Sequence, residues 1–151
     1  MDLVQAFDIL FLIGRIIVGG FFLMNAYNHF TKADMMAGYA QSKGTPAPKL
    51  AVMGSGVLLL LGGLSFLLGY HPTIGTILLV IFLLGVSFKI HAFWLVSDPM
   101  GRVNEQAHFS KNIAMIGLLL MTLMIYRPWH LSLAMLTDRL GRLATAARLQ
   151  H

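Results

Sequence analysis

The stretch FKIHAFWLVSDPMGRVNEQAHFSKN, residues 88–112, holds the densest polar and aromatic chemistry in a chain that is otherwise mostly apolar. It begins inside an apolar run and leaves that run through His91 and Trp94. It then turns at Asp98-Pro99 and returns to apolar sequence after Asn112. The stretch therefore separates two apolar segments, and any chemistry of the chain is expected to concentrate around it.

The composition on either side of this stretch is that of a membrane protein. Hydrophobic residues make up 57% of the 151 residues and charged residues 11%, against roughly 25% charged in ordinary soluble domains. A surface with so little charge is suited to lipid. The net charge of +5 fits basic flanks near anionic head groups, so we expect a lipid bilayer and no nucleic acid as partner. The absence of cysteine excludes disulfides and thiolate metal sites within this chain.

Four apolar runs are long enough, or nearly so, to cross a hydrocarbon core of about 30 Å as helices. They are residues 9–28, 50–70, 74–95 and 113–126, the last being short. Short connections between such runs favour an up-down-up-down arrangement. The predicted fold is therefore all-α, with a four-helix transmembrane domain over residues 1–129 and a separate segment over 130–151.

Two further helices are expected outside the spans, whereas residues 96–110 are expected to form a polar loop. The first connection, residues 31–49, predicts a short interfacial helix that ends at Ser42, before Gly44. In the C-terminal segment, apolar residues recur at three- and four-residue spacing, which predicts an amphipathic helix with a basic face. The apolar positions are Leu133, Leu136, Leu140, Leu143 and Ala147, and the basic ones are Arg139, Arg142 and Arg148. Such a helix lies on a membrane surface or docks on a partner.

Topology predicts the candidate site. The first and third spans run in the same direction, so both end on one face, where the second and fourth begin. Seven polar or aromatic residues should collect there: His29, Lys49, His91, Trp94, Asp98, Lys111 and Asn112. The candidate ligand-binding residues among them are His29, Lys49, His91, Trp94 and Asn112.

Three interpretations of this collection remain open. It forms a pocket for an amphipathic ligand such as a quinone head group, an interfacial belt of aromatic and basic residues, or a haem or metal site. In the first, Ser87 is expected to orient the ring of His91, one turn away. No metal-ligand spacing and no catalytic residue can be assigned.

Arg15 lies deep in the first span, where a charged group is costly. Its long side chain either snorkels to the interface or serves a function. Asp8, two turns earlier on a similar face, is a candidate partner for it with help from water.

Several segments resemble members of the DoxX family of membrane proteins. These are GRIIVGGFF at residues 14–22, YAQSKGTPAP at 39–48, GGLS at 62–65, HAFW at 91–94 and FSKNIA at 109–114. The similarity runs from about Arg15 to Gly117, and the family's usual lysine at the end of the first helix is replaced here by His29-Phe30. The C-terminal helix lies beyond the usual family core.

The resemblance implies a four-helix integral membrane protein linked to quinone-dependent redox complexes. We therefore expect a small subunit of such a complex, with protein partners in the membrane and quinone as the one cofactor to consider. The bacterial inner membrane is the expected location, with both termini on one side, the cytoplasmic one. A non-catalytic anchor or assembly factor and a stand-alone quinone-dependent oxidoreductase are the alternatives.

Overall fold

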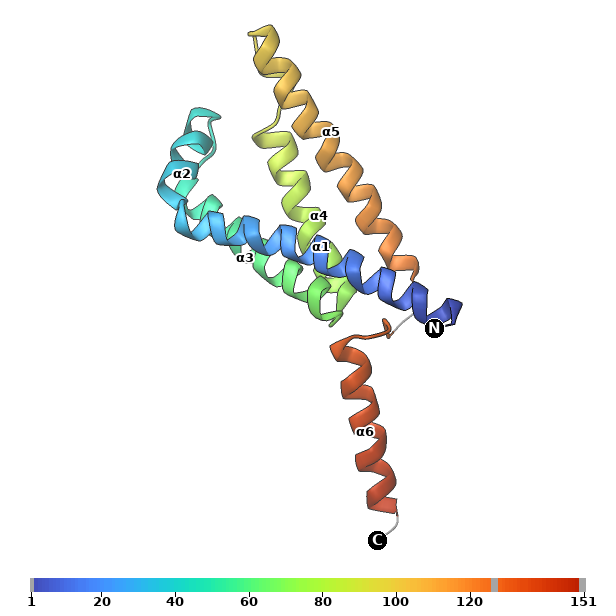
Figure 1. Cartoon of the computed structure of the whole chain (residues 1–151). Coiled ribbons are helices and arrows are strands. Elements are labelled where there is room, and N and C mark those ends of the chain that lie inside the picture. Colours follow the sequence, from blue (N-terminus) through green and yellow to red (C-terminus); the bar gives the residue numbers. More distant parts are fainter. Residues whose placement is uncertain (1, 126–127, 150–151) are drawn as a thin grey trace.

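The computed structural model describes residues 2–125 and 128–149, and the regular secondary structure of the described chain is all helical (Figure 1). The helices are α1 (Leu3–Thr31), α2 (Ala33–Ser42), α3 (Pro48–Leu68), α4 (Pro72–Lys89), α5 (Pro99–Met121) and α6 (Leu133–Leu149). Two short 3-10 turns, η1 (Phe93–Leu95) and η2 (Thr122–Met124), follow α4 and α5. Four of these elements, α1, α3, α4 with η1, and α5 with η2, are long and apolar enough to cross a membrane.

The largest departure from the expectation concerns residues 96–110, which were predicted to form a loop. Helix α5 begins already at Pro99, and the Asp98 side chain caps it by accepting a hydrogen bond from the backbone N–H of Gly101 at 2.6 Å. Proline suits the first helical position because its missing N–H has no helical partner there. The Asp98-Pro99 pair is thus a helix start, and the polar stretch becomes the first three turns of α5.

The spanning helices pack in sequence order. Helix α1 lies on α3, α3 on α4, and α4 on α5, while α2 lies on α3 (Figure 1). The main core is formed by buried apolar side chains of all four spans and by one residue beyond them: Phe22, Ala26, Leu59, Phe66, Leu79, Leu83, Leu119 and Trp129. A smaller cluster of Ala37, Ala40 and Val52 holds α2 against α3. That α2 lies at the membrane interface remains a prediction.

Small residues permit a close contact between helices α1 and α3. A methyl group added at Gly19 would meet the Leu67 Cβ at 2.9 Å and the Gly63 carbonyl oxygen at 3.0 Å. The neighbouring Gly20 has open space around it. Close approach of this kind is how small residues stabilise helix pairs in lipid, where no hydrophobic force draws helices together.

Arg15 joins three separate segments at the end of the bundle where α3 ends. Its side chain is only 3% exposed and donates to the carbonyls of Phe66, Leu67, His130 and Leu131 at 2.9–3.2 Å. The first two belong to the last turn of α3, whose carbonyls lack the usual partner four residues further on and carry partial negative charge. The Phe66 carbonyl also accepts from the Gly69 N–H at 3.3 Å. Arg15 therefore stabilises a helix end and holds the segment that leads to α6.

Asp8 and Arg15, both described residues, form no direct ion pair. Asp8 lies instead beside His130, with its Oδ2 3.6 Å from the Nδ1 of that ring. Four of the five Arg15 N–H donors bind carbonyl oxygens, so the guanidinium is hydrogen-bonded without a carboxylate partner.

Helix α6 extends away from the four spanning helices (Figure 1). The leucines of its predicted apolar stripe are exposed: Leu133, Leu136, Leu140 and Leu143. Asp138 and Arg142 form an ion pair along the helix. The stripe is thus uncovered within the described part of this chain.

Candidate functional site

Glu105 is the centre of a polar cluster formed by the end of α4, the start of α5 and helix α2. The side chain of Glu105 is buried, with the residue 7% exposed. Its Oε1 accepts hydrogen bonds from the Tyr39 hydroxyl and the Lys43 ammonium, both at 2.7 Å. Its Oε2 accepts one from His91 Nδ1, also at 2.7 Å. A buried carboxylate is stable only when paired and hydrogen-bonded in this way.

The contact with Glu105 decides the orientation of His91. An ionised carboxylate can only accept hydrogen bonds, so Nδ1 carries the proton. The opposite nitrogen, Nε2, is then left to accept or exchange a proton with another group. Ser87 does not orient this ring as expected, because its hydroxyl donates to the Leu83 carbonyl at 2.5 Å.

A second histidine lies against the first. The rings of His91 and His108 are stacked, with centroids 4.9 Å apart and planes 16° from parallel. Two rings at this distance interact electrostatically, so charge on one disfavours charge on the other. Together with Lys43 and Tyr39 they surround the single carboxylate with groups that can donate protons.

Helical spacing explains how the cluster assembles. Tyr39 on α2 and Lys43, the residue that follows its last turn, are four residues apart, so they lie on one face of that helix. Glu105, His108 and Asn112 are spaced by three and four residues on α5 and share a face in the same way. The packing of α2 on α3 and of α4 on α5 then brings these faces together at the end of α4.

The cluster also affects the two proton-bearing groups of α2. The hydrogen bond to Glu105 raises the pKa of the Lys43 ammonium above its ordinary value. Burial, followed by the same carboxylate, raises the pKa of the Tyr39 hydroxyl. Both groups are therefore held in their protonated forms, as donors to Glu105.

The five residues predicted as a site are not in one place. His91 belongs to the Glu105 cluster, and Asn112 is buried further along α5. His29 is buried against α4: its Nδ1 lies 2.8 Å from the Asn25 carbonyl and its ring meets that of Phe82 at 5.8 Å.

Lys49 and Trp94 are both exposed. Lys49 forms a surface ion pair with Asp34 at 2.7 Å. Trp94 belongs to an aromatic group at the end of α4, composed of Phe88, Phe93, Trp94 and Phe109, with ring centroids 5.1–6.1 Å apart. Nothing in these contacts assigns a ligand to either residue.

Sequence reasoning missed Glu105, Tyr39, Lys43 and His108. The available signal was the three- and four-residue spacing from Glu105 to Asn112, which is visible only when residues 99–112 are taken as a helix. Within the ranges that the structure describes, no three His, Cys, Asp or Glu side chains are grouped so as to hold a metal ion.

Comparison with known proteins identifies one family. The DoxX family model matches residues 10–92, which is more than half of the chain and includes Tyr39, Lys43 and His91. Glu105 and His108 lie beyond the matched residues. No curated protein and no solved structure was found to match the chain.

Proposed function

The chain belongs to the DoxX family of membrane proteins, and from that premise and the Glu105 cluster we propose that it is a small integral subunit of a larger, quinone-linked redox complex. Its four apolar helices make it an integral membrane protein. The Glu105 cluster supports a specific role for this subunit, which is to exchange protons with the quinone or quinol at one end of the bundle.

The observation that carries this proposal is the hydrogen bond between His91 and Glu105. A carboxylate that holds Nδ1–H leaves Nε2 as a base, and neutral imidazole suits proton exchange near neutral pH. The chemistry of a quinone fits such a group, because its carbonyl oxygens accept a hydrogen bond and its reduced hydroxyls donate one. His91 would thus take the proton of a quinol hydroxyl or return it to a quinone oxygen.

The aromatic group beside the cluster supports an apolar ring or tail. Phe88, Phe93 and Phe109 surround Trp94 in edge-on or tilted contacts, and aromatic side chains commonly line sites for apolar ligands. Oxidation of one quinol releases two protons and two electrons. In this proposal the chain handles protons, and other subunits of the complex carry the electrons.

A second function is favoured by a different observation, the exposed leucine stripe of α6. A membrane anchor or assembly factor would use this helix to hold a partner subunit, with no need for the Glu105 cluster. A stand-alone quinone-dependent oxidoreductase is the third candidate.

For the location, we propose the bacterial cytoplasmic membrane with both termini on the cytoplasmic side, since the arginines of α6 suit an anionic inner leaflet.

The composition of the solubilised complex tests the proposal. The tagged chain is purified in mild detergent from its native membrane, and co-purifying proteins and extracted quinone are measured. Partner subunits together with near-stoichiometric quinone support the proposal. Partners without quinone favour the anchor, and quinone without partners favours the stand-alone enzyme. Neither in a folded sample would contradict all three.

A further inference from the structure

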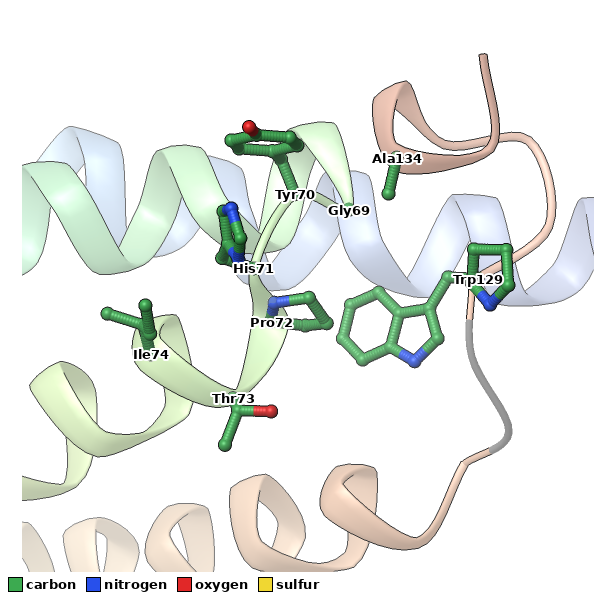
Figure 2. Close-up of a pocket in the computed structure, with 9 residues that line it drawn as sticks. Gly69, Tyr70, His71, Pro72, Thr73, Ile74, Trp129 and Ala134 are labelled. Atoms are coloured by element: carbon green, nitrogen blue, oxygen red, sulfur yellow. The ribbon is translucent and has the colours of Figure 1, made fainter. Parts of the chain in front are cut away.

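The leucine stripe of α6 lies on the side of the helix that is turned away from the bundle. Ala134, in the first turn of α6, lines a cavity together with the turn between α3 and α4 (Figure 2). Leu136, Leu140 and Leu143 fall on the opposite side of the helix, and they are 58%, 65% and 68% exposed. The bundle therefore holds one side of α6 and leaves the stripe uncovered within the described part of the chain.

The direction of α6 is fixed where the helix begins. Arg15 donates to the carbonyls of His130 and Leu131 at 3.0 and 3.1 Å. The buried Ser132 side chain then caps the helix by accepting a hydrogen bond from the Met135 N–H at 3.2 Å. Held in this way, α6 extends away from the spanning helices (Figure 1). The stripe is therefore presented beyond the end of the spans, where a neighbouring molecule in the same membrane can meet it.

The spacing of the stripe is that of a coiled-coil seam. Its members are separated by three, four and three residues: Leu133, Leu136, Leu140 and Leu143. This alternation is that of the a and d positions of a heptad. A helix that covers a broad apolar surface usually carries further apolar residues beside these positions, but here the neighbouring positions hold Thr137 and Arg139. A stripe this narrow is suited to contact with one other helix.

The charges of α6 leave the seam free for an identical helix. Asp138 and Arg142 pair with each other along the helix, away from the stripe, at 3.0 Å. In a parallel pair in register, Arg139 of one helix is opposite position 144 of the other, which is alanine in the sequence, so no like charges meet. A different partner helix is commonly selected by complementary charges beside the seam. The sequence places only Arg139 there, which favours pairing between two copies.

The membrane aligns two copies for this pairing. All copies cross it in the same direction, so their α6 helices start at the same depth and run parallel. Helix α6 has 17 residues, and an isolated helix of that length is marginal in water. Confinement to one membrane raises the effective concentration of the second helix, which offsets the shortness of the seam.

We infer that α6 pairs with α6 of a second copy of this chain as a parallel two-stranded coiled coil, with the leucine stripe as the seam. The interface is two-fold symmetric, with the axis along the pair. The two bundles lie on the outer sides of the pair, because Ala134 meets its own bundle on the side opposite to the stripe. The inference does not rest on proton exchange at the Glu105 cluster.

Single cysteines test the inference, because the chain has none of its own. Leu143→Cys places a thiol in the seam, whereas Thr145→Cys places one on the opposite face. Membranes that contain each full-length variant, at a high and a low expression level, are treated with a mild oxidant, and the linked products are identified by mass spectrometry. Equivalent seam positions of a parallel pair are close enough for a disulfide, so Leu143→Cys should form linked dimer at least about tenfold faster than Thr145→Cys at both levels.

A charge in the seam provides the second test. In the Leu143→Cys background, Leu140→Asp places a carboxylate between the two helices, and Thr145→Asp places the same group on the outer face. The first should lower the rate of cross-linking at least about tenfold, because an unpaired charge in an apolar seam is costly. The second should leave the rate unchanged. Leu140 and Thr145 are both exposed, so both variants should keep the bundle folded, which thermal unfolding checks.

Three results would overturn the inference. Equal cross-linking at positions 143 and 145 would indicate random collision. Cross-linking at neither position would exclude the pair, and protection of the thiol at position 143 from a water-soluble maleimide would then place the stripe on the lipid surface. A linked product that contains a different protein would assign the seam to a partner subunit.

Discussion

Arg15 Nη1 lies 3.0 Å from the carbonyl oxygen of His130, a residue 115 positions further along the chain. This hydrogen bond links the first span, α1, to the segment that precedes α6. The same guanidinium holds two carbonyls at the end of α3. One buried side chain thus determines where the last part of the chain leaves the bundle.

The substitution Arg15→Lys tests this link. Lysine keeps the charge but lacks the planar fork that reaches carbonyls on two separate segments. We expect the free energy of unfolding to fall by at least about 2 kcal/mol, because hydrogen bonds to a charged group contribute about 1.5–3 kcal/mol each. Thermal unfolding in detergent measures the loss, and limited proteolysis should show faster cleavage near residues 128–132. Arg142→Lys, in an exposed ion pair, is the control; equal melting temperatures for the two variants would contradict the role of Arg15.

The adjacent glycines of α1 provide a matched pair. Gly19→Ala places a methyl group against the backbone of α3, whereas Gly20→Ala places one in open space. The first should destabilise the protein by about 1–3 kcal/mol through overpacking. The second should be neutral or slightly stabilising, since alanine is the better helix former. Unfolding of the two variants under the same conditions measures the difference, and similar melting temperatures would show that α1 does not approach α3 closely at Gly19.

Removal of the charge of Glu105 should destabilise the fold more than removal of the charge of a surface carboxylate. Glu105→Gln leaves Lys43 without its ionic partner and replaces one acceptor oxygen by a donor, so we expect a loss of about 1–3 kcal/mol. Asp34→Asn, at a carboxylate whose side chain is 86% exposed, should have almost no effect. Thermal unfolding of both variants tests this ranking. The reverse order would mean that the cluster does not stabilise the fold.

The stability of the cluster should also fall at alkaline pH. The pKa values of Lys43 and Tyr39 are raised in the folded protein above the ordinary values of 10.5 and 10.0 that apply to the unfolded chain. The contribution of these two groups to the free energy of unfolding is therefore complete below those ordinary values, and it declines as the pH rises through the pKa values of the folded protein. A Tyr39→Phe, Lys43→Met double variant should start less stable but lose less on going above about pH 10. Melting temperatures across this range provide the comparison, and an unchanged slope would show that these groups do not titrate with folding.

Apolar runs and short connections predicted the fold correctly, because in lipid the backbone leaves few options other than helices. The start of α5 was missed because its first turns are polar, and hydropathy alone cannot separate a polar helix from a loop. The cap formed by Asp98 and Pro99 was the local signal that should have extended the helix.

The site was predicted only in part, for a geometric reason. Topology brings His91 and His29 to one end of the bundle, but it does not say which side chains touch. His29 turns toward Phe82 inside the bundle, whereas His91 turns toward Glu105. The contacts of Tyr39 and Lys43 with Glu105 depend on how α2 packs on α3. The spacing of residues within one helix does not predict that packing.

Quinone-linked activity of the assembled complex tests whether His91, held by Glu105, exchanges protons with a quinone. His91→Ala is compared with Trp94→Phe and with His130→Ala, a control at the opposite end, after the amount of each chain in the membrane has been equalised. We expect His91→Ala to lower turnover by at least tenfold with normal membrane levels, since a positioned acid–base group contributes about 10²–10⁴-fold. Trp94→Phe should have a milder effect, and His130→Ala none. Full activity of His91→Ala in an intact complex would contradict the claim and leave this end of the bundle as an interfacial anchor.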